Sequence, residues 1–367
     1  MIDEFKALYH ASLQTDSHSA FYRYPLQNIY HGVISQNLCE LTNEREGFII
    51  RPFGPHLKPQ LIENQIGVQF TTALTLNIPH TTNYTEAFLE SYHSFLNAPT
   101  KTYPSTYYKK TASHEASQTE YIEAIQKSQL EMQRGHFKKV VLSRITKIKY
   151  TQTSPVIDLF FSLCAKYPKA FISLISSANY GTWLGASPEV LVHQQAENYT
   201  TVALAGTKKS SDETLFSSKE AEEQNIIKEY IENSLALQNI KSESSAREDF
   251  DTGGLTHLKT SIYFTAPASS RLTIAEALHP TPAVGGYPKN NAVDFILENE
   301  HYDREIYAGY IGAINKEELN LYVNIRCMQW LPEYALLYAG AGITMASKAE
   351  AEWEETENKR KIISDVL

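Results

Sequence analysis

Between residues 170 and 205, four strand-like segments follow one another with no helical pattern between them. They are Ala170 to Ser176, Thr182 to Gly185, Val190 to His193 and Tyr199 to Ala205. Successive strands without intervening helices favour antiparallel sheets, since a doubly wound fold alternates strand and helix. The segment therefore predicts an α+β fold in which antiparallel sheets are flanked by helices.

Helices are predicted on both sides of this segment. One runs from about Thr119 to Gly135, and the strand Lys139 to Ile145 follows it. Ser154-Pro155 opens a second helix, since serine caps helices well and proline is tolerated in a first turn. A long helix is predicted from Lys219 to Gln238, introduced by the capping-box pattern Ser217-x-x-Glu220.

The last third of the chain is predicted to return to strands. The candidates span residues 307–314, 320–329 and 334–338, and Ala339 to Gly342 is predicted to end the last of them. Ser347-x-x-Glu350 then opens a terminal helix.

The first 96 residues are predicted to form short strands and loops, with Gly47 to Phe53 as one strand. Residues 97–118 are rich in Thr, Ser, Pro, Lys and Tyr and nearly lack aliphatic side chains. This composition predicts an exposed connection between an N-terminal portion and the rest of the chain.

The charge balance narrows the partners that the protein can have. The 367 residues include 33 Lys and Arg against 42 Asp and Glu, a formal charge of −9. Nucleic acids and anionic membranes are bound through clustered basic residues, so neither is expected as a partner. A small anionic ligand requires only that positive groups gather in one site.

Cysteine usage and hydropathy indicate the compartment. Cys39, Cys164 and Cys327 form no CxxC pair, which argues against a disulfide framework and a structural zinc site. The N-terminus has no basic region followed by a long apolar run. The longest mostly apolar stretch, Ala335 to Ala346, is shorter than the roughly 18 residues of a membrane helix. We expect a soluble cytoplasmic protein.

One carboxylate is predicted on the apolar face of the long helix. Glu223 lies on the same stripe as Ile227, Ile231 and Leu235. A carboxylate on a buried face is costly unless it is paired or binds a cation.

Two more carboxylates share one face of the terminal helix, where Glu352, Glu355, Lys359 and Ile362 are aligned. An exposed charged helix with i,i+4 ion pairs also explains that spacing. If the two helices faced each other, Glu223, Glu352 and Glu355 would offer hard oxygen ligands suited to Mg²⁺.

Seven strings follow one another in order from about residue 119 to the C-terminus. They are Lys139-Val140-Val141-Leu142-Ser143-Arg144, Gly185-Ala186-Ser187-Pro188-Glu189, Leu204-Ala205-Gly206-Thr207, His279-Pro280-Thr281-Pro282-Ala283, Tyr302-Asp303-Arg304-Glu305, Ile325-Arg326-Cys327, and Ala339-Gly340-Ala341-Gly342-Ile343 with Glu352-Trp353-x-Glu355-Thr356. Together they resemble the chorismate-utilising enzymes, specifically isochorismate synthase.

The resemblance implies a fold and an activity. It implies one large domain with two subdomains, in which residues 1–110 are the variable N-terminal part and residues 111–367 the chorismate-binding catalytic region. It also implies Mg²⁺-dependent isomerisation of chorismate to isochorismate, in which water adds at C2, the ring double bonds shift and the C4 hydroxyl leaves. The product would feed menaquinone or siderophore biosynthesis. A monomer without a glutaminase subunit is expected.

The catalytic pair is implied position by position. Lys139 matches the general base that activates water, and Glu189 the general acid that protonates the leaving hydroxyl. Burial would lower the pKa of Lys139 and raise that of Glu189, as these roles require. Each string alone would equally fit a strand-end lysine that reaches solvent and a turn carboxylate.

The other matched positions concern metal and substrate. Glu223 and Glu355 match direct Mg²⁺ ligands, Glu352 matches a ligand that acts through water, and the ion would hold the ring carboxylate of chorismate. His257 resembles a family histidine near the ring, although a packed core histidine has the same pattern. The remaining substrate-binding matches are Arg326 and Lys359 for the enolpyruvyl carboxylate, the backbone of Gly206, Thr207, Gly340 and Ala341 as an anion cradle, and Ala283.

Related enzymes are separated at two positions. Anthranilate synthases carry glutamine where this chain has Lys139, which favours water over ammonia as the nucleophile. Aminodeoxychorismate synthases place a nucleophilic lysine where this chain reads Leu204-Ala205-Gly206-Thr207. Salicylate synthases share the base and the acid and then eliminate pyruvate, and local motifs separate them poorly. A non-catalytic chorismate-binding homologue would have lost the acid, the base or the metal ligands, and none is lost here.

Overall fold

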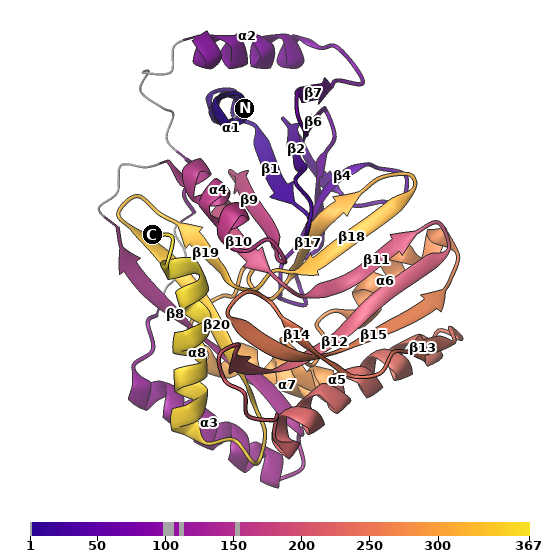
Figure 1. The fold of residues 1–367 in the computed structure, drawn as a ribbon, viewed down its shortest axis with the longest axis vertical. Helices are drawn as coiled ribbons and strands as arrows, with labels where there is room; N and C mark the ends of the chain where they lie inside the picture. The colour runs from indigo at the N-terminus through magenta and orange to yellow at the C-terminus, as the bar shows by residue number, and fades with distance from the viewer. Residues whose placement is uncertain (1, 98–105, 110–113, 151–154) are drawn as a thin grey trace.

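A computed structural model describes residues 2–97, 106–109, 114–150 and 155–367. Two large sheets form its centre, and helices cover their outer faces and ends (Figure 1). The strand pairs of the described residues run antiparallel in both sheets. The predicted α+β fold with antiparallel sheets is therefore confirmed.

The first sheet has ten strands in the order β16-β8-β20-β19-β10-β9-β1-β2-β6-β7. The N-terminal strands β1, β2, β6 and β7 thus form one end of a sheet whose other strands come from later in the chain. The bounds in sheet order are Gly286–Tyr287, Lys139–Lys149, Tyr334–Ile343, Cys327–Trp330, Gly181–Ser187, Phe171–Ser177, His18–Arg23, Tyr30–Ser35, Ile66–Phe70 and Leu74–Asn77.

The second sheet has the order β13-β15-β12-β11-β18-β17-β4-β5-β3, and β14 pairs with β15 beside β13. It too combines N-terminal strands with strands from the rest of the chain. The bounds in that order are Ser242–Ser244, Leu255–Thr265, Asn198–Lys209, Val190–Gln195, Glu318–Val323, Tyr310–Ile314, Gly47–Arg51, Gln60–Glu63 and Leu38–Glu40, with β14 at Glu248–Asp251.

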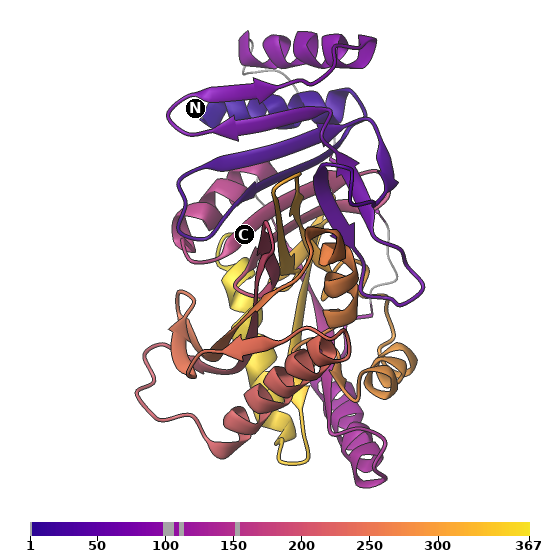
Figure 2. The ribbon, with the colours of Figure 1, turned by 90° about the vertical axis from the view of Figure 1, so that its right-hand side faces the viewer.

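The helices lie at both ends of the molecule and along its sides. Figures 1 and 2 both show α1 and α2 at one end and α3 at the opposite end. The bounds are Ile2–Gln14 (α1), Asn83–Asn97 (α2), Gln118–Gln133 (α3), Val156–Lys166 (α4), Ser218–Ala236 (α5), Arg271–Leu278 (α6), Lys289–Asn299 (α7) and Ala349–Ser364 (α8), with a short 3₁₀ turn at Ala268–Ser270.

Two apolar clusters hold these layers together. In β9, Phe171 and Ile175 belong to one cluster, while Ile172 and Leu174 belong to a second cluster shared with α1 and α4. Because successive strand residues point to opposite faces, β9 is buried on both sides. This explains why its apolar residues, Phe171, Ile172, Leu174 and Ile175, do not alternate regularly with polar ones.

The prediction for the first 96 residues is right for its strands and wrong where it leaves out α1 and α2. Every residue from Ala7 to Leu13 in α1 is buried, so no polar face marks it as an amphipathic helix. In α2 the buried residues are Thr85, Phe88 and Tyr92, an apolar stripe too thin to predict a helix.

The predicted strand at residues 320–329 is two strands in different sheets. The second-sheet strand β18 ends at Val323, and the first-sheet strand β19 begins at Cys327. Between them the chain crosses over, with Arg326 in the left-handed region at φ 51°. Apolar residues continue through both strands, so the sequence pattern does not reveal the crossing.

Two predictions about where a strand ends and where a helix begins are also corrected. The last strand continues to Ile343 instead of ending at Ala339, because its glycines pair with β8 like any other strand residues. The residue that caps α8 is Lys348, while the hydroxyl of Ser347 accepts a hydrogen bond from the Thr344 amide. By contrast, the predicted capping box of Ser217 at the start of α5 is confirmed.

Part of the predicted connection can be compared with the structure. Residues 106–109 lie against the first sheet: the Tyr107 carbonyl accepts from Thr182, and Lys109 Nζ lies 2.6 Å from Glu305. This part is therefore packed rather than fully exposed. The predicted cap at Ser154 and the predicted boundary at residue 110 lie outside the described residues.

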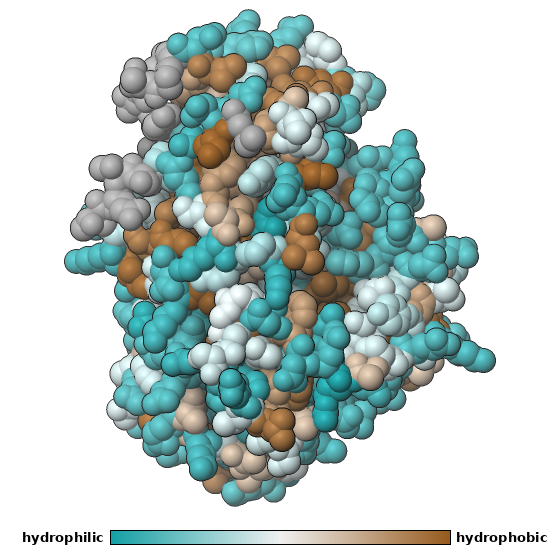
Figure 3. Space-filling view, in the orientation of Figure 1, coloured by the Kyte–Doolittle hydropathy of each residue, from teal (hydrophilic) through white to brown (hydrophobic). Residues whose placement is uncertain are grey.

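The face in Figure 3 is largely hydrophilic, with hydrophobic residues in separate groups. Within the described ranges, no helix combines the length and the apolar character needed to cross a bilayer.

Candidate active site

A cavity with an empty volume of about 730 Å³ takes side chains from both sheets and from α5 and α8. Charged, polar and apolar side chains from distant parts of the chain converge on it, as is typical of ligand sites. The predicted residues that line it are Lys139, Glu189, Gly206, Thr207, Glu223, His257, Ala283, Arg326, Gly340, Glu355 and Lys359.

Lys139 is the first residue of β8 and is 2% exposed. Its strand is held between β16 and β20, so the side chain points into the cavity instead of reaching solvent. A Cβ atom at Gly342 would lie 3.0 Å from Lys139 Cε and 3.2 Å from Glu223 Oε2, so glycine is needed for this close approach. Burial lowers the pKa of Lys139, while the nearby Glu223 carboxylate acts in the opposite direction.

Glu189 lies between β10 and β11 and is also buried. Its amide donates to the Ser187 hydroxyl, and its carbonyl accepts from the Val323 amide, which fixes the turn. Burial raises the pKa of Glu189 to about 7, and the positive charges of Lys139, Lys359 and Arg326 oppose this rise. The carboxyl group can thus hold a proton near neutral pH.

Arg326 and His257 form a hydrogen-bonded chain on another wall of the cavity. Arg326 Nη2 lies 2.6 Å from His257 Nε2, and His257 Nδ1 lies 2.7 Å from the Gly206 carbonyl oxygen. A carbonyl only accepts and a guanidinium only donates, so Nδ1 carries the proton and Nε2 accepts from Arg326. Burial has the largest effect in lowering the pKa of His257, and the positive charge of Arg326 lowers it further. The ring is therefore neutral.

The strand that carries Gly206 is irregular at this point. The register of β12 against β15 shifts between Ala205 and Lys208, and Gly206 has φ 67°. The irregularity turns the Gly206 carbonyl toward His257, an orientation that regular pairing with β15 would not allow.

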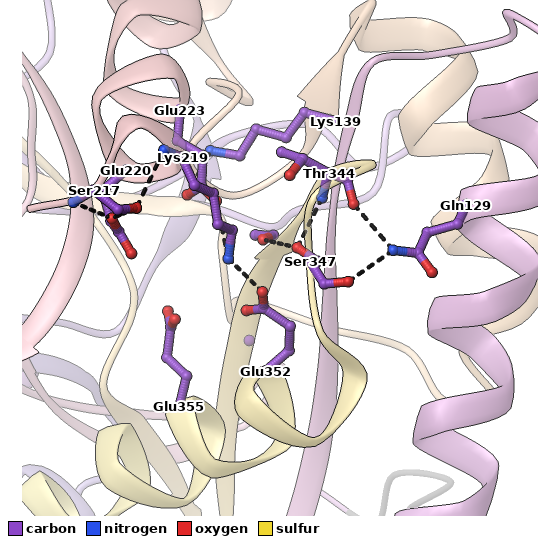
Figure 4. A network of polar contacts seen from close by, with 12 residues as sticks. Gln129, Lys139, Ser217, Lys219, Glu220, Glu223, Thr344, Ser347, Glu352 and Glu355 are labelled. Atoms are coloured by element: carbon purple, nitrogen blue, oxygen red, sulfur yellow. Dashed lines mark hydrogen bonds and ion pairs between the residues drawn. The ribbon is translucent and has the colours of Figure 1, made fainter.

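The helices α5 and α8 both contribute carboxylates to this region: Glu223 comes from α5, and Glu352 and Glu355 come from α8. Figure 4 shows Glu352 and Glu355 on α8 below Glu223 and Lys219 on α5. Lys219 Nζ is hydrogen-bonded to Glu352 Oε1 and lies 3.5 Å from Glu223 Oε1. The side chains of Glu223 and Glu352 are only 9% and 2% exposed. The alternative of an exposed charged helix therefore fails for Glu352, although the i,i+4 pair that it expects is present between Glu355 and Lys359.

Lys359 connects α8 to the last strand. Its Nζ lies 2.7 Å from Glu355 Oε1 and donates to the Gly340 carbonyl at 2.9 Å. In an antiparallel strand the N–H and C=O of one residue point the same way, so both backbone groups of Gly340 face this side.

Ala341 does not belong to the cavity. It is fully buried, forms part of an apolar cluster and pairs with Leu142 of β8. Backbone groups of successive strand residues point to opposite strand edges, so those of Ala341 face β8 while those of Gly340 face Lys359. We therefore remove Ala341 from the candidate site. Glu352 lies just outside the cavity, in an adjoining recess that it shares with Lys219.

The sequence analysis did not identify Tyr307, which also lines the cavity. A Cβ atom at Gly340 would lie 2.9 Å from the Tyr307 hydroxyl, which places this hydroxyl beside the last strand. Tyr307 was included in the predicted strand 307–314, but β17 begins only at Tyr310. The one sequence feature that could have identified Tyr307 as a site residue is its position close after the matched string Tyr302 to Glu305.

The string Tyr302 to Glu305 does not line the cavity, but its Arg304 supports residues that do. Arg304 makes two hydrogen bonds to the Glu300 carboxylate, at 2.6 and 2.7 Å. It also donates to the carbonyls of Val141 in β8 and of Val284, both of which line the cavity. This buried guanidinium thus positions the strand that carries Lys139.

The donor set of the three glutamates fits Mg²⁺. No three His, Cys, Asp or Glu side chains of the described residues are gathered closely enough to hold a metal as they stand. However, the buried Glu223 Oε1 has no hydrogen-bond partner among those residues. Burial and the neighbouring Glu355 charge raise the pKa of Glu352, and burial raises that of Glu223. Carboxylates in this setting gain from a hard cation.

Sequence comparisons place the chain among known proteins. The sequence model of a family described as chorismate binding enzyme matches residues 59–367. Isochorismate synthase EntC of Escherichia coli (strain K12) is 32% identical over 247 residues, which cover 62% of this chain and 62% of EntC. Isochorismate synthase MenF of Bacillus subtilis (strain 168) is 28% identical over 269 residues, covering 70% of this chain and 57% of that protein. The matches therefore span less than two thirds of the length of these curated relatives.

Solved structures share the fold. The menaquinone-specific isochorismate synthase MenF from Escherichia coli has a TM-score of 0.80 at 20% identity, covering 98% of this chain and 91% of that one. Anthranilate synthase component I from Streptococcus pneumoniae TIGR4 has a TM-score of 0.66 at 19% identity, covering 95% and 90%. The fold is thus common to enzymes with different names, and the reaction has to be argued from the site.

Proposed function

Since the chain belongs to the family of chorismate binding enzymes, we propose that it is an isochorismate synthase, an isomerase that moves the hydroxyl of chorismate from C4 to C2. One observation carries the proposal: Lys139 and Glu189 are both buried and line the same cavity, with the pKa of the lysine lowered and that of the carboxyl raised. Such a pair can supply a base and an acid at the same pH.

The roles follow from the protonation states. Neutral Lys139 accepts a proton from a water molecule whose oxygen bonds to C2. The ring double bonds shift, the C4–O bond breaks, and protonated Glu189 gives its proton to the departing hydroxyl, which leaves as water. One water is consumed and one is released, and proton exchange with solvent restores both side chains.

Positive groups in the cavity suit a dicarboxylate substrate. Arg326 and Lys359 offer donors for the enolpyruvyl carboxylate, and the backbone of Gly340 lies beside Lys359. Glu223 and Glu355 would hold Mg²⁺ directly and Glu352 through water. The ion, when bound, supplies charge that orients and partly neutralises the ring carboxylate.

Water, rather than ammonia, is the proposed nucleophile. A lysine base serves water activation, and the stretch Leu204 to Thr207 brings no lysine nucleophile into the cavity. With water as the nucleophile, the proposed enzyme needs no glutaminase subunit, and that it acts as a monomer stays an expectation. Ammonium salts added to the assay are expected to leave the product unchanged.

Product analysis tests the function. Purified protein with Mg²⁺ and chorismate should form isochorismate, detected by chromatography, without pyruvate. Formation of pyruvate with salicylate would show a salicylate synthase instead. Folded protein that binds chorismate and leaves it unchanged would show a non-catalytic homologue. The curated matches include the vibriobactin-specific isochorismate synthase of Vibrio cholerae as well as MenF, so both siderophore and menaquinone pathways are candidates for the product.

A further inference from the structure

Lys219 occupies the space between two buried carboxylates from different helices. It lies in the first turn of α5, and its ammonium group contacts Glu223 of the same helix and Glu352 of α8 (Figure 4). The capping box of Ser217 and Glu220 fixes this first turn, so the lysine starts from a defined position.

The charges around Lys219 require a cation. Glu223, Glu352 and Glu355 carry three negative charges when ionised. Lys359 is already engaged with Glu355, and Lys139, the proposed neutral base, lies 3.9 Å from Glu223 and does not contact Glu352. Glu223 and Glu352 are almost inaccessible to water, so without a cation they would repel each other in a poorly screened environment. The Lys219 ammonium is the cation that contacts both in this structure.

We propose that Lys219 is a placeholder cation, meaning that its ammonium group holds Glu223 and Glu352 together until Mg²⁺ binds and then moves away. This inference rests on the proposed Mg²⁺ site. An ammonium group and a metal ion cannot use the same carboxylate oxygens at once, and the two positive charges repel each other. Metal binding is therefore an exchange of one cation for another.

The Lys219 side chain can reach a second position that leaves the two carboxylates free. The recess that Lys219 shares with Glu352 is also lined by Glu354 and Asn358 of α8, and Glu354 is exposed to solvent. The flexible four-carbon stem of lysine allows its ammonium to swing from Glu352 toward Glu354 while the backbone of α5 stays in place. The exchange lowers the apparent Mg²⁺ affinity, and it keeps the carboxylates ordered when no metal is bound.

Calorimetric Mg²⁺ titration of Lys219→Met tests this exchange without any measurement of turnover. Lys228→Met is the matched control, because Lys228 pairs with Glu232 at i,i+4 on the same helix, away from the cavity. Relative to wild type, Lys219→Met is expected to bind Mg²⁺ about tenfold more tightly, as expected when one competing, partly buried ion pair is lost. Its melting temperature without metal should fall, and added Mg²⁺ should raise it by more than in wild type. Lys228→Met should match wild type in Mg²⁺ affinity.

Equal or weaker Mg²⁺ binding by Lys219→Met would overturn the inference. Absence of Mg²⁺ binding in wild type and both variants would overturn it together with the metal assignment. Isochorismate formation by wild type, measured separately, distinguishes either failure from failure of the proposed function. Should the methionine variant not fold, Lys219→Gln removes the charge while keeping a hydrogen-bond donor for Glu352, and the same outcomes apply.

Discussion

The ammonium nitrogen of Lys139 lies 3.9 Å from Oε2 of Glu223, and both side chains are buried. The proposed base and a proposed metal ligand therefore share one wall of the cavity. Burial lowers the pKa of the lysine, and the carboxylate limits this fall. Changes to the charge around Glu223 should thus alter the pKa of Lys139 as well as the affinity for Mg²⁺.

Removal of Lys139 should abolish turnover and leave the fold intact. In Lys139→Ala we expect kcat to fall by about 10²–10⁴-fold, the usual contribution of a general base. Lys138→Ala, at the exposed neighbouring position, is the control and should retain activity. Steady-state kinetics with circular dichroism spectra of both variants provide the check. Near-wild-type kcat in Lys139→Ala would remove this residue as the base.

The proton on Glu189 should control the alkaline side of the activity profile. The pKa of Glu189 is raised to about 7, so the protonated acid is present below that pH and is lost as the pH rises through it. We expect kcat/KM, which reports pKa values of the free enzyme, to decline above about pH 7, and Glu189→Gln to bind chorismate with little turnover. A profile that keeps rising through pH 8 would contradict the assignment of Glu189 as the acid.

Removal of Glu355 should weaken metal binding. Glu355→Ala loses a proposed direct ligand and frees Lys359 from its ion pair, so both changes place more positive charge near the metal. The Mg²⁺ concentration for half-maximal activity should rise by about tenfold or more, in line with losing one ligand interaction. Glu350→Ala removes an exposed carboxylate of the same helix that lines neither the cavity nor the recess, and it serves as the control. An unchanged Mg²⁺ requirement in Glu355→Ala would argue against its role as a ligand.

His257 should act by positioning Arg326. Its Nε2 accepts from the guanidinium, so His257→Leu leaves a buried donor without its partner. We expect KM for chorismate to rise by about tenfold, because a hydrogen bond to a charged group is worth roughly 1.5–3 kcal/mol, with kcat affected less. His257→Gln can present an acceptor oxygen near the Nε2 position and should recover part of the loss. If kcat falls while KM stays constant, His257 acts on the reacting atoms instead.

The sequence predicted more of the site's charged residues than of its geometry. Glu223 could be placed on a buried face because the helical period aligns it with Ile227 and Leu235, and burial of all three is confirmed. Arg326 was predicted in the middle of a strand, whereas it lies where the chain crosses between sheets. Such a crossing depends on pairing between distant strands, which local periodicity does not report.

Other features of the structure could not be predicted from the sequence, for related reasons. Lys219 and Glu223 have the i,i+4 spacing of an ordinary surface ion pair, so nothing local shows that α8 covers them. The buried helix α1 lacks a polar face that would mark it as a helix. Ala341 was assigned from its string, but strand alternation places it on the core side of β20.

The origin of the transferred oxygen tests the central claim most directly. Isochorismate formed from unlabelled chorismate in H₂¹⁸O should carry one ¹⁸O atom, located on C2, because the attacking nucleophile is a water molecule activated by Lys139. Mass spectrometry with NMR assignment of the labelled carbon would measure this. Isochorismate without the label would mean that the C4 oxygen itself migrates, and the proposed roles of Lys139 and Glu189 would then be wrong.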